Sequence, residues 1–163
     1  MTAEDQARRT MYLAAAGSAA LLIGAFVFEA LGYAPCKLCI WQRWPHAVAV
    51  VAGLLVAVSG PKFIWSVIGT FGALISGGLG IYHTGVEKGW WEGPSSCSGD
   101  AGALSGMSGA DLLSTAGPVN IVMCDEVAWS LMGISMASWN AVFSLILALI
   151  WVQASKALNT KEG

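Results

Sequence analysis

The chain has 163 residues, enough for one domain, and only 11% of them are charged, against roughly 25% in a typical soluble protein. Apolar residues make up 56%. The few charged side chains could not cover the surface of a soluble domain. The net charge of −2 and the scattered basic residues provide no patch for nucleic acid, and we therefore expect a membrane protein.

Four runs without Asp, Glu, Lys or Arg are long enough for a helix to cross the hydrocarbon core of a bilayer, which takes about 20 residues. We predict an all-α membrane protein: a single domain over residues 1–163 that folds as a four-helix transmembrane bundle. The predicted transmembrane helices cover residues 11–31, 43–60, 63–84 and 130–152. Pro45 would then lie in the first turn of the second helix, where its missing N–H costs nothing.

The connections predict how the helices are arranged. Ser59-Gly60-Pro61-Lys62 is a tight turn, so the second and third helices should form an antiparallel pair. The remaining links, residues 32–42 and a long loop over residues 85–129 between helices three and four, should lie together on the opposite side. An even number of spans places both termini on one side of the membrane.

The distribution of basic residues predicts the orientation. The side with the termini carries Arg8, Arg9, Lys62, Lys156 and Lys161, whereas the other side carries Lys37, Arg43 and Lys88. Because Lys and Arg are enriched in cytoplasmic segments, we expect cytoplasmic termini and periplasmic loops in a bacterial inner membrane.

The first apolar run could instead be a signal peptide, since Arg8 and Arg9 precede it and Gly32-Tyr33-Ala34 resembles a cleavage site. The run is longer than the roughly 7–15 residues of a usual signal-peptide core. Cleavage would also leave three spans, with the termini on opposite sides. We therefore favour four spans.

All four cysteines, Cys36, Cys39, Cys97 and Cys124, lie outside the predicted hydrocarbon region. A structural zinc site would need a second closely spaced pair, but 26 residues separate Cys97 from Cys124 and no histidine lies near them. A structural disulfide within Cys36-x-x-Cys39 would restrain the unfolded chain little, whereas a bridge in the long loop could be structural. The sequence alone leaves the pairing open.

A redox role fits the surroundings of the first pair. The second helix should begin at or just after Cys39, and Arg43 follows one turn later on the same face. A helix N-terminus and a cation both favour a thiolate, which we expect at Cys39, although Arg43 could instead only anchor the helix among headgroups. Two dithiols can pass oxidation by exchange, but the electrons then need a lipid-soluble acceptor, a quinone.

With these features in place, the sequence resembles the disulfide bond formation protein B (DsbB) family. The resemblance rests on four spans, Cys36-x-x-Cys39 at the end of the first outward link, Arg43 four residues later, and a cysteine pair in the long loop. It covers essentially the whole chain. Three further segments resemble a subgroup of the family: Tyr82–Glu87, Trp90–Pro94 and Cys124-Asp125-Glu126.

The resemblance implies a quinone-dependent protein-dithiol oxidoreductase with redox-active disulfides Cys36–Cys39 and Cys97–Cys124. Cys97 would accept attack from a DsbA-like periplasmic thioredoxin-fold partner, and Cys124 would exchange with Cys36. Cys39 would engage the cofactor, ubiquinone or menaquinone, while Arg43 would bind that quinone and stabilise negative charge. We expect no metal.

His83 and Glu87 lie four residues apart near the outward end of the third helix, so they share a face. Quinone reduction consumes two protons and histidine titrates near neutral pH, so we expect His83 to bind or protonate the quinone with Glu87 orienting it. The alternative is an interfacial histidine and a solvated glutamate. We expect structural roles for His46 and Asn140, and headgroup contact for Glu29.

Three other functions remain open. A family member could run in reverse or serve a dedicated partner, and reduction potentials, which the sequence does not give, decide the direction. A non-enzymatic scaffold with structural disulfides is the opposing class. An enzyme of the vitamin K epoxide reductase type would carry its loop cysteines before the Cys-x-x-Cys motif, the opposite of the order here.

Overall fold

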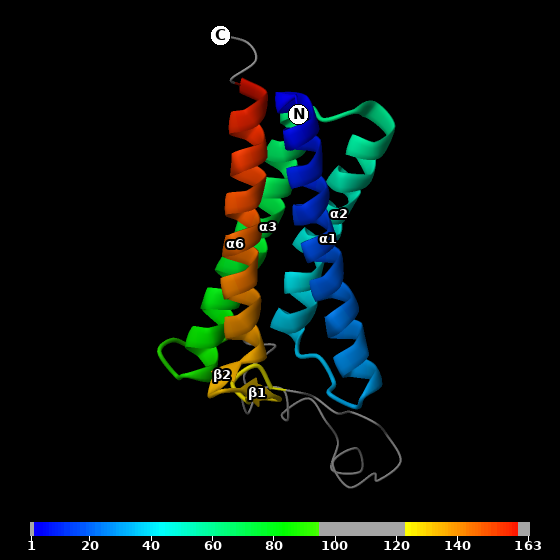
Figure 1. Cartoon of the computed structure of the whole chain (residues 1–163). Coiled ribbons are helices and arrows are strands. Elements are labelled where there is room, and N and C mark those ends of the chain that lie inside the picture. Colours follow the sequence, from blue (N-terminus) through cyan, green and yellow to red (C-terminus); the bar gives the residue numbers. More distant parts are fainter. Residues whose placement is uncertain (1, 95–122, 160–163) are drawn as a thin grey trace, which may run out of the picture.

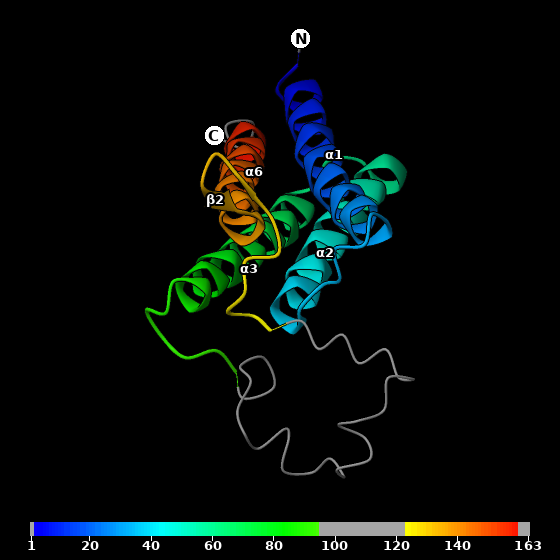
Figure 2. The ribbon, with the colours of Figure 1, turned by 90° about the horizontal axis from the view of Figure 1, so that it is seen from below.

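The computed structural model describes residues 2–94 and 123–159. Within these residues, four long helices form a bundle: α1 (Ala3–Ala30), α2 (Lys37–Ser59), α3 (Phe63–Glu87) and α6 (Met136–Asn159). They follow one another around the bundle in the order α1, α2, α3, α6, and each packs against two neighbours (Figures 1 and 2). The predicted all-α four-helix bundle is confirmed.

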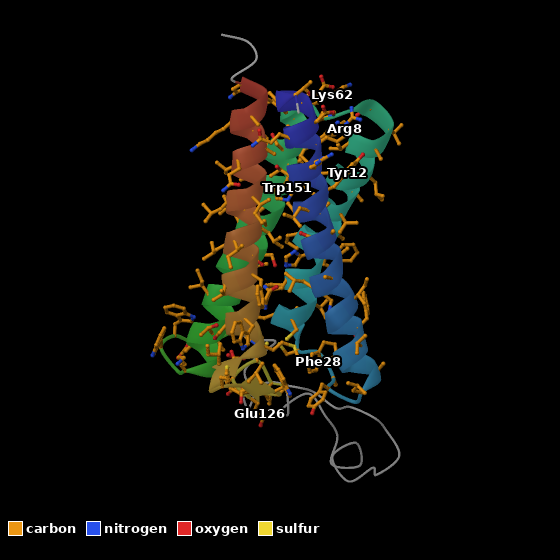
Figure 3. All side chains as sticks on the ribbon, viewed as in Figure 1. Arg8, Tyr12, Phe28, Lys62, Glu126 and Trp151 are labelled. Carbon is orange, nitrogen blue, oxygen red and sulfur yellow. The ribbon has the colours of Figure 1, made fainter. Side chains whose placement is uncertain are left out.

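All four helices are long and apolar enough to cross a membrane. Large apolar side chains cover their outer faces, including Phe26, 58% exposed, and Val58, 87% exposed. A soluble monomer does not expose apolar surface on this scale, whereas hydrocarbon solvates it. The start of α1, the end of α6 and the turn between α2 and α3 share one end of the bundle, where Arg8 and Lys62 lie (Figures 1 and 3).

The second helix, α2, begins two residues before Cys39, where the sequence predicted its start, and six residues before the predicted membrane span of residues 43–60. Cys36 caps α2: its backbone is extended, and its Sγ accepts the N–H of Cys39 at 3.3 Å. The helix therefore begins before the charge-free run does, because Lys37 and Arg43 extend from its end where the side chains can leave the hydrocarbon. Pro45 consequently lies inside the helix and not in its first turn.

The predicted start of the fourth helix is wrong by six residues. Residues 130–135 form a hairpin of β1 (Ser130–Leu131) and β2 (Ile134–Ser135). Met132 and Gly133 join the strands with φ angles of 56° and 76°, as a two-residue hairpin turn requires. The Oγ of Ser135 then accepts the N–H of Ser138 at 3.2 Å in the first turn of α6. Apolar residues in this hairpin make it indistinguishable by composition from the helix that follows.

Small residues on α3 let its neighbours approach closely. Gly69 lies under the ring of Trp151 from α6, and Gly80 faces the α6 backbone at Ala137 and Ala141. On the other side, a Cβ at Gly72 would lie 2.8 Å from the carbonyl oxygen of Pro45. Close backbone contacts of this kind are the usual basis of helix association in lipid.

We expect Gly72→Ala to destabilise the bundle by about 1–3 kcal/mol, as overpacking does. The added methyl group would meet the backbone of α2, so the two helices must separate. Thermal or SDS-induced unfolding followed by circular dichroism measures the effect. Gly78→Ala is the matched control, because a Cβ there meets nothing within 4 Å. Equal stability of the two variants would contradict the packing argument.

Candidate functional site

Cys36 and Cys39 lie at the end of the bundle opposite the chain termini and form a pair of free thiols. Their Sγ atoms are 3.2 Å apart and share a hydrogen bond. Cys36 is buried, at 4% exposure, while Cys39 is half-buried. The two sulfurs are close enough to exchange electrons as one dithiol and disulfide couple.

The negative charge of this dithiol is favoured at Cys36. The hydrogen bond shared with Cys39 lowers the pKa of Cys36 most strongly, burial opposes this, and contacts with His83 and the backbone N–H of Cys39 lower the pKa further. The sequence predicted the thiolate at Cys39. The difference follows from the helix start, because α2 begins at Lys37 and its N-terminus therefore acts on Cys36.

His83 faces Cys36 because Gln42 fixes its orientation. The Nε2 of Gln42 donates to the carbonyl oxygen of Leu38 at 3.1 Å and to Nδ1 of His83 at 2.9 Å. A neutral His83 therefore carries its proton on Nε2, which lies 3.5 Å from the Sγ of Cys36. The imidazole is thus set to donate to a thiolate.

Glu87 approaches the same nitrogen of His83 that faces Cys36. Its Oε1 is 3.9 Å from Nε2 of His83, and it is within hydrogen-bond reach of Ser135. Gln42 makes the shorter contact with His83, so it is the residue that orients the ring. Both His83 and Glu87 lie beside Cys36 and not on the wall of the cavity described below. Their predicted contact with quinone stays a prediction.

We expect the thiolate of Cys36 to persist into mildly acidic solution and to be lost only as the pH falls through its lowered pKa. Replacing His83 with phenylalanine removes a donor to the charged sulfur, so the titration midpoint should rise by about 1–2 pH units. Thiolate absorbance at 240 nm, with Cys36→Ser as the subtracted control, measures this. A wild-type midpoint at the value of a free thiol would contradict the assignment.

Sγ of Cys36, Sγ of Cys39 and Nε2 of His83 all lie within 4.8 Å of one another. The sequence offered no histidine to the zinc interpretation, and the fold brings one to the first cysteine pair. A metal on Nε2 would require His83 to donate from Nδ1, as ligating histidines do. Here Nδ1 accepts from Gln42. The hydrogen bonding therefore presents a proton to Cys36 and not a ligand lone pair.

Cys124, near the end of the long loop, lies beside the first cysteine pair. It is fully buried and disulfide-bonded. It packs with Cys36, Leu38 and Val86 in one buried cluster. Its predicted partner, Cys97, lies outside the described residues, so the Cys97–Cys124 pairing stays a prediction.

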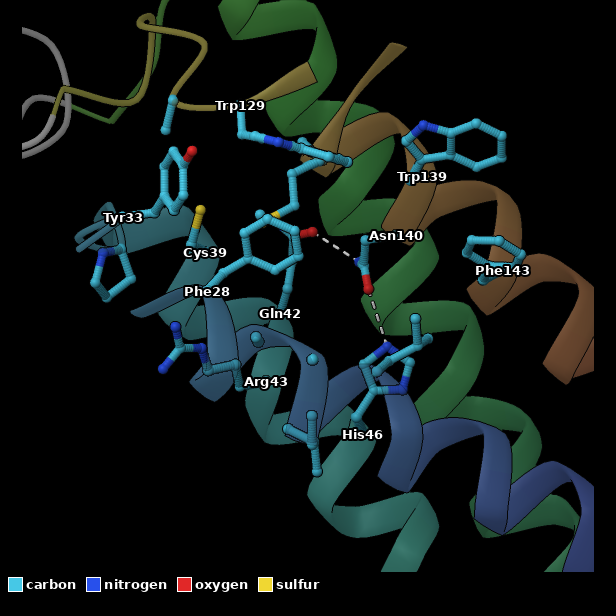
Figure 4. A pocket seen from close by; sticks show the side chains of 18 of the residues that line it. Phe28, Tyr33, Cys39, Gln42, Arg43, His46, Trp129, Trp139, Asn140 and Phe143 are labelled. Atoms are coloured by element: carbon cyan, nitrogen blue, oxygen red, sulfur yellow. Dashed lines mark hydrogen bonds between the residues drawn. The ribbon is translucent and has the colours of Figure 1, made fainter. Parts of the chain in front are cut away.

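A cavity of about 330 Å³ opens beside Cys39 between α1, α2, α6 and the hairpin (Figure 4). This volume is within the range of small-molecule sites. Its walls are mostly apolar, with aromatic side chains from four parts of the chain: Phe28, Tyr33, Trp129, Trp139 and Phe143. Cys39 lies on the wall, whereas Cys36 does not. The cavity therefore suits a flat apolar ligand that reacts with Cys39.

Arg43 is the cation on the cavity wall. Its Nη1 donates to Oε2 of Glu29 at 2.6 Å, and its Cζ lies 4.9 Å from the centre of the Phe26 ring. Glu29, expected to reach only the headgroups, thus holds the guanidinium from α1. Within the described residues, the buried Nε of Arg43 has no hydrogen-bond partner, so the guanidinium keeps unused donor capacity.

Gln42, His46 and Asn140 also line the cavity, and we call them the inner polar cluster. Nδ2 of Asn140 donates to Oε1 of Gln42 at 2.7 Å, and Nε2 of His46 lies 3.1 Å from Oδ1 of Asn140 (Figure 4). Sequence reasoning gave His46 and Asn140 structural roles and did not single out Gln42. The signal available in the sequence was that each of these polar side chains lies inside an apolar span. A polar side chain there costs free energy and usually has a partner or a function.

The chain is similar in sequence to known proteins. The family model "Disulfide bond formation protein DsbB" matches residues 7–154. Two relatives named "Disulfide bond formation protein B" are 31% identical over 151 residues in Xanthomonas oryzae and 32% identical over 154 residues in an Acidovorax strain. The matches cover 85% and 88% of this chain, and 82% and 84% of the relatives. No solved structure matches the chain significantly.

Proposed function

The chain belongs to the DsbB family of disulfide bond formation proteins, and on that premise we propose that it reoxidises a DsbA-like periplasmic protein and passes the electrons to membrane quinone. Family membership implies thiol oxidoreductase activity. The partner, the quinone and the direction of electron flow belong to the proposal.

The observation that carries the proposal is that the two thiols, Cys36 and Cys39, have different surroundings. Cys36 packs with Cys124, which lies near the end of the long loop. Cys39 lines the apolar cavity together with Arg43. These surroundings support the proposal that Cys36 exchanges with the loop disulfide and that Cys39 delivers electrons to a ligand in the cavity.

The thiol–disulfide exchange steps balance without an added oxidant. An oxidant is needed only afterwards, to reoxidise Cys36 and Cys39. A thiolate of the reduced partner attacks Sγ of Cys97, which releases the Cys124 thiolate, and the partner's second thiolate then closes the partner's disulfide. Cys124 attacks Cys36 and releases Cys39 as a thiolate. Attack by Cys97 on Cys124 restores the loop disulfide and leaves Cys36 and Cys39 reduced.

A bound quinone would accept the two electrons and two protons that are released when the Cys36–Cys39 disulfide forms again. The residues present fit such a group: the walls are apolar, Cys39 faces the cavity, and Arg43 offers an unused N–H. Arg43 would hold a ring oxygen and stabilise negative charge as it develops. His83 would donate a hydrogen bond to the Cys36 thiolate and so make this thiolate less nucleophilic.

The orientation in the membrane is also part of the proposal. Arg8 and Lys62 lie at the end of the bundle with the termini (Figure 3), whereas α2 begins, directly after Cys36, at the other end (Figure 1). The excess of basic residues at the terminal end supports a cytoplasmic location for it and a periplasmic location for the cysteines.

The full-length protein in lipid nanodiscs tests the function directly. With a reduced thioredoxin-fold protein and a decyl-tailed benzoquinone, we expect one partner disulfide to form for each quinone reduced, over many turnovers. Omitting the quinone should stop the reaction after the protein's own disulfides are consumed. A scaffold with structural disulfides would show no quinone-dependent oxidation in either case.

A further inference from the structure

The inner polar cluster of Gln42, His46 and Asn140 lies deeper in the bundle than the cysteines. His46 follows Cys39 by seven residues, about 10 Å along the axis of α2. Each member lines the cavity, and His46 is only 2% exposed. Apart from Gln42, which orients His83, the cluster has no role in the steps described above, so the atoms that it leaves free for a ligand are informative.

Backbone carbonyls fix the two amides of the cluster. The Nε2 of Gln42 is bonded to the carbonyl of Leu38 and to His83, so both of its hydrogens are used and Oε1 faces Asn140. Nδ2 of Asn140 contacts that Oε1, and also the carbonyl oxygen of Ser76 at 3.3 Å. Because a carbonyl oxygen only accepts, neither amide can be reversed without opposing two oxygens.

The amides in turn fix the tautomer of His46. Oδ1 of Asn140 can only accept, so Nε2 of His46 carries the proton in the bond between them. Nδ1 of the neutral ring is then an acceptor. Within the described residues, this buried nitrogen has no hydrogen-bond partner. A buried polar atom without a partner is rare in proteins and calls for an explanation, such as a functional role or a bound molecule.

The hydrogen-bonding capacity left in the cluster is therefore of one kind. Every N–H of Gln42, Asn140 and His46 is already donated, and what remains are lone pairs on their oxygens and on Nδ1 of His46. Arg43, closer to Cys39, has the opposite character because it offers only donors. The cavity wall thus carries a residue with unused donor capacity toward Cys39 and residues with unused acceptor capacity at its inner end.

We propose that the inner polar cluster is a hydroxyl-binding subsite, with His46 as its principal acceptor, and that it makes the cavity bind a quinol more tightly than the corresponding quinone. A quinone offers only carbonyl oxygens, whereas a quinol offers a hydroxyl that Nδ1 can accept. This inference rests on the proposed function, since it concerns the ligand of the same cavity.

Such a preference would assist the reaction. A site that binds the reduced ring more tightly makes the bound quinone a stronger oxidant than quinone free in the lipid. One added hydrogen bond corresponds to about a tenfold preference, which is about 30 mV for a two-electron couple. His46 would then promote electron transfer from Cys39 from the inner end of the cavity, without contacting the sulfur.

The test measures binding without turnover. Cys36→Ser with Cys39→Ser in the full-length protein gives a redox-inert parent, in which serine at residue 36 keeps the helix cap. Anaerobic equilibrium dialysis with nanodiscs, corrected with empty nanodiscs, gives separate dissociation constants for a decyl-tailed benzoquinone and its hydroquinone. We expect the parent to bind the hydroquinone about tenfold more tightly.

His46→Leu should weaken hydroquinone binding about tenfold and leave quinone binding unchanged, whereas His46→Gln, which can donate to Asn140 and still present an oxygen, should retain the preference. Ser144→Ala is the control, because Ser144 contacts only the Nε2 side of His46 and does not line the cavity. Circular dichroism verifies folding. Equal binding of both forms by the parent, or an unchanged ratio in His46→Leu, would overturn the inference. Failure of the parent to bind either form would instead count against the proposed function.

Discussion

Cys39→Ser should lower quinone reduction by at least about 10³-fold while leaving the first oxidation of the partner intact. Cys39 is the cysteine on the cavity wall, so it is the sulfur that can deliver electrons there. Serine preserves the hydrogen bond toward Cys36 but cannot form a disulfide. The variant should therefore oxidise a stoichiometric amount of partner through its loop disulfide and then stop.

Cys97→Ser is the matched change at the other end of the relay. It should abolish oxidation of the protein partner, because the proposed relay has the partner attack this sulfur. Dithiothreitol, a small reductant, should still reduce the Cys36–Cys39 pair and so support quinone reduction in this variant. Rapid-quench thiol trapping with mass spectrometry follows both pairs, and quinone absorbance follows delivery. Quinone-dependent turnover by both variants with the protein partner would exclude the relay.

The sequence predicted the architecture well because charge-free runs of membrane length are local features. Four such runs correspond to α1, α2, α3 and α6. The errors arose where composition carries no signal. The hairpin at residues 130–135 is as apolar as a span, and the cap at Cys36 precedes the charged residues Lys37 and Arg43, which hid the first turns of α2.

The candidate site was predicted in part for a related reason. Cys36, Cys39 and Arg43 stand close together in the sequence, so their spacing on a helix could be read directly. The contacts that define their surroundings join different helices, as do Glu29 with Arg43, Gln42 with His83, and His46 with Asn140. No spacing rule gives such pairs. The sequence could show only that polar residues in apolar spans need partners.

Arg43→Gln should reduce quinone turnover about 10²-fold without slowing the attack of the partner on the loop disulfide. The guanidinium carries a positive charge on the wall of the cavity that Cys39 also lines, and its Nε is without a hydrogen-bond partner among the described residues, whereas glutamine supplies neither the charge nor the same reach. Because the charge matters most as electrons arrive, kcat should fall more than the KM for quinone rises. Steady-state kinetics over a range of quinone concentrations separates the two effects.

Glu29→Gln distinguishes a charge effect from a packing effect at the same place. The Glu29 carboxylate offsets the charge of Arg43 in the resting protein, and the pair is partly exposed, so its loss should change stability little. Removing the carboxylate leaves the guanidinium unopposed beside the cavity, and quinone reduction should be maintained or accelerated. If Glu29→Gln instead impaired turnover as strongly as Arg43→Gln, the ion pair would act by fixing the position of Arg43 against α1, and its charge would be secondary.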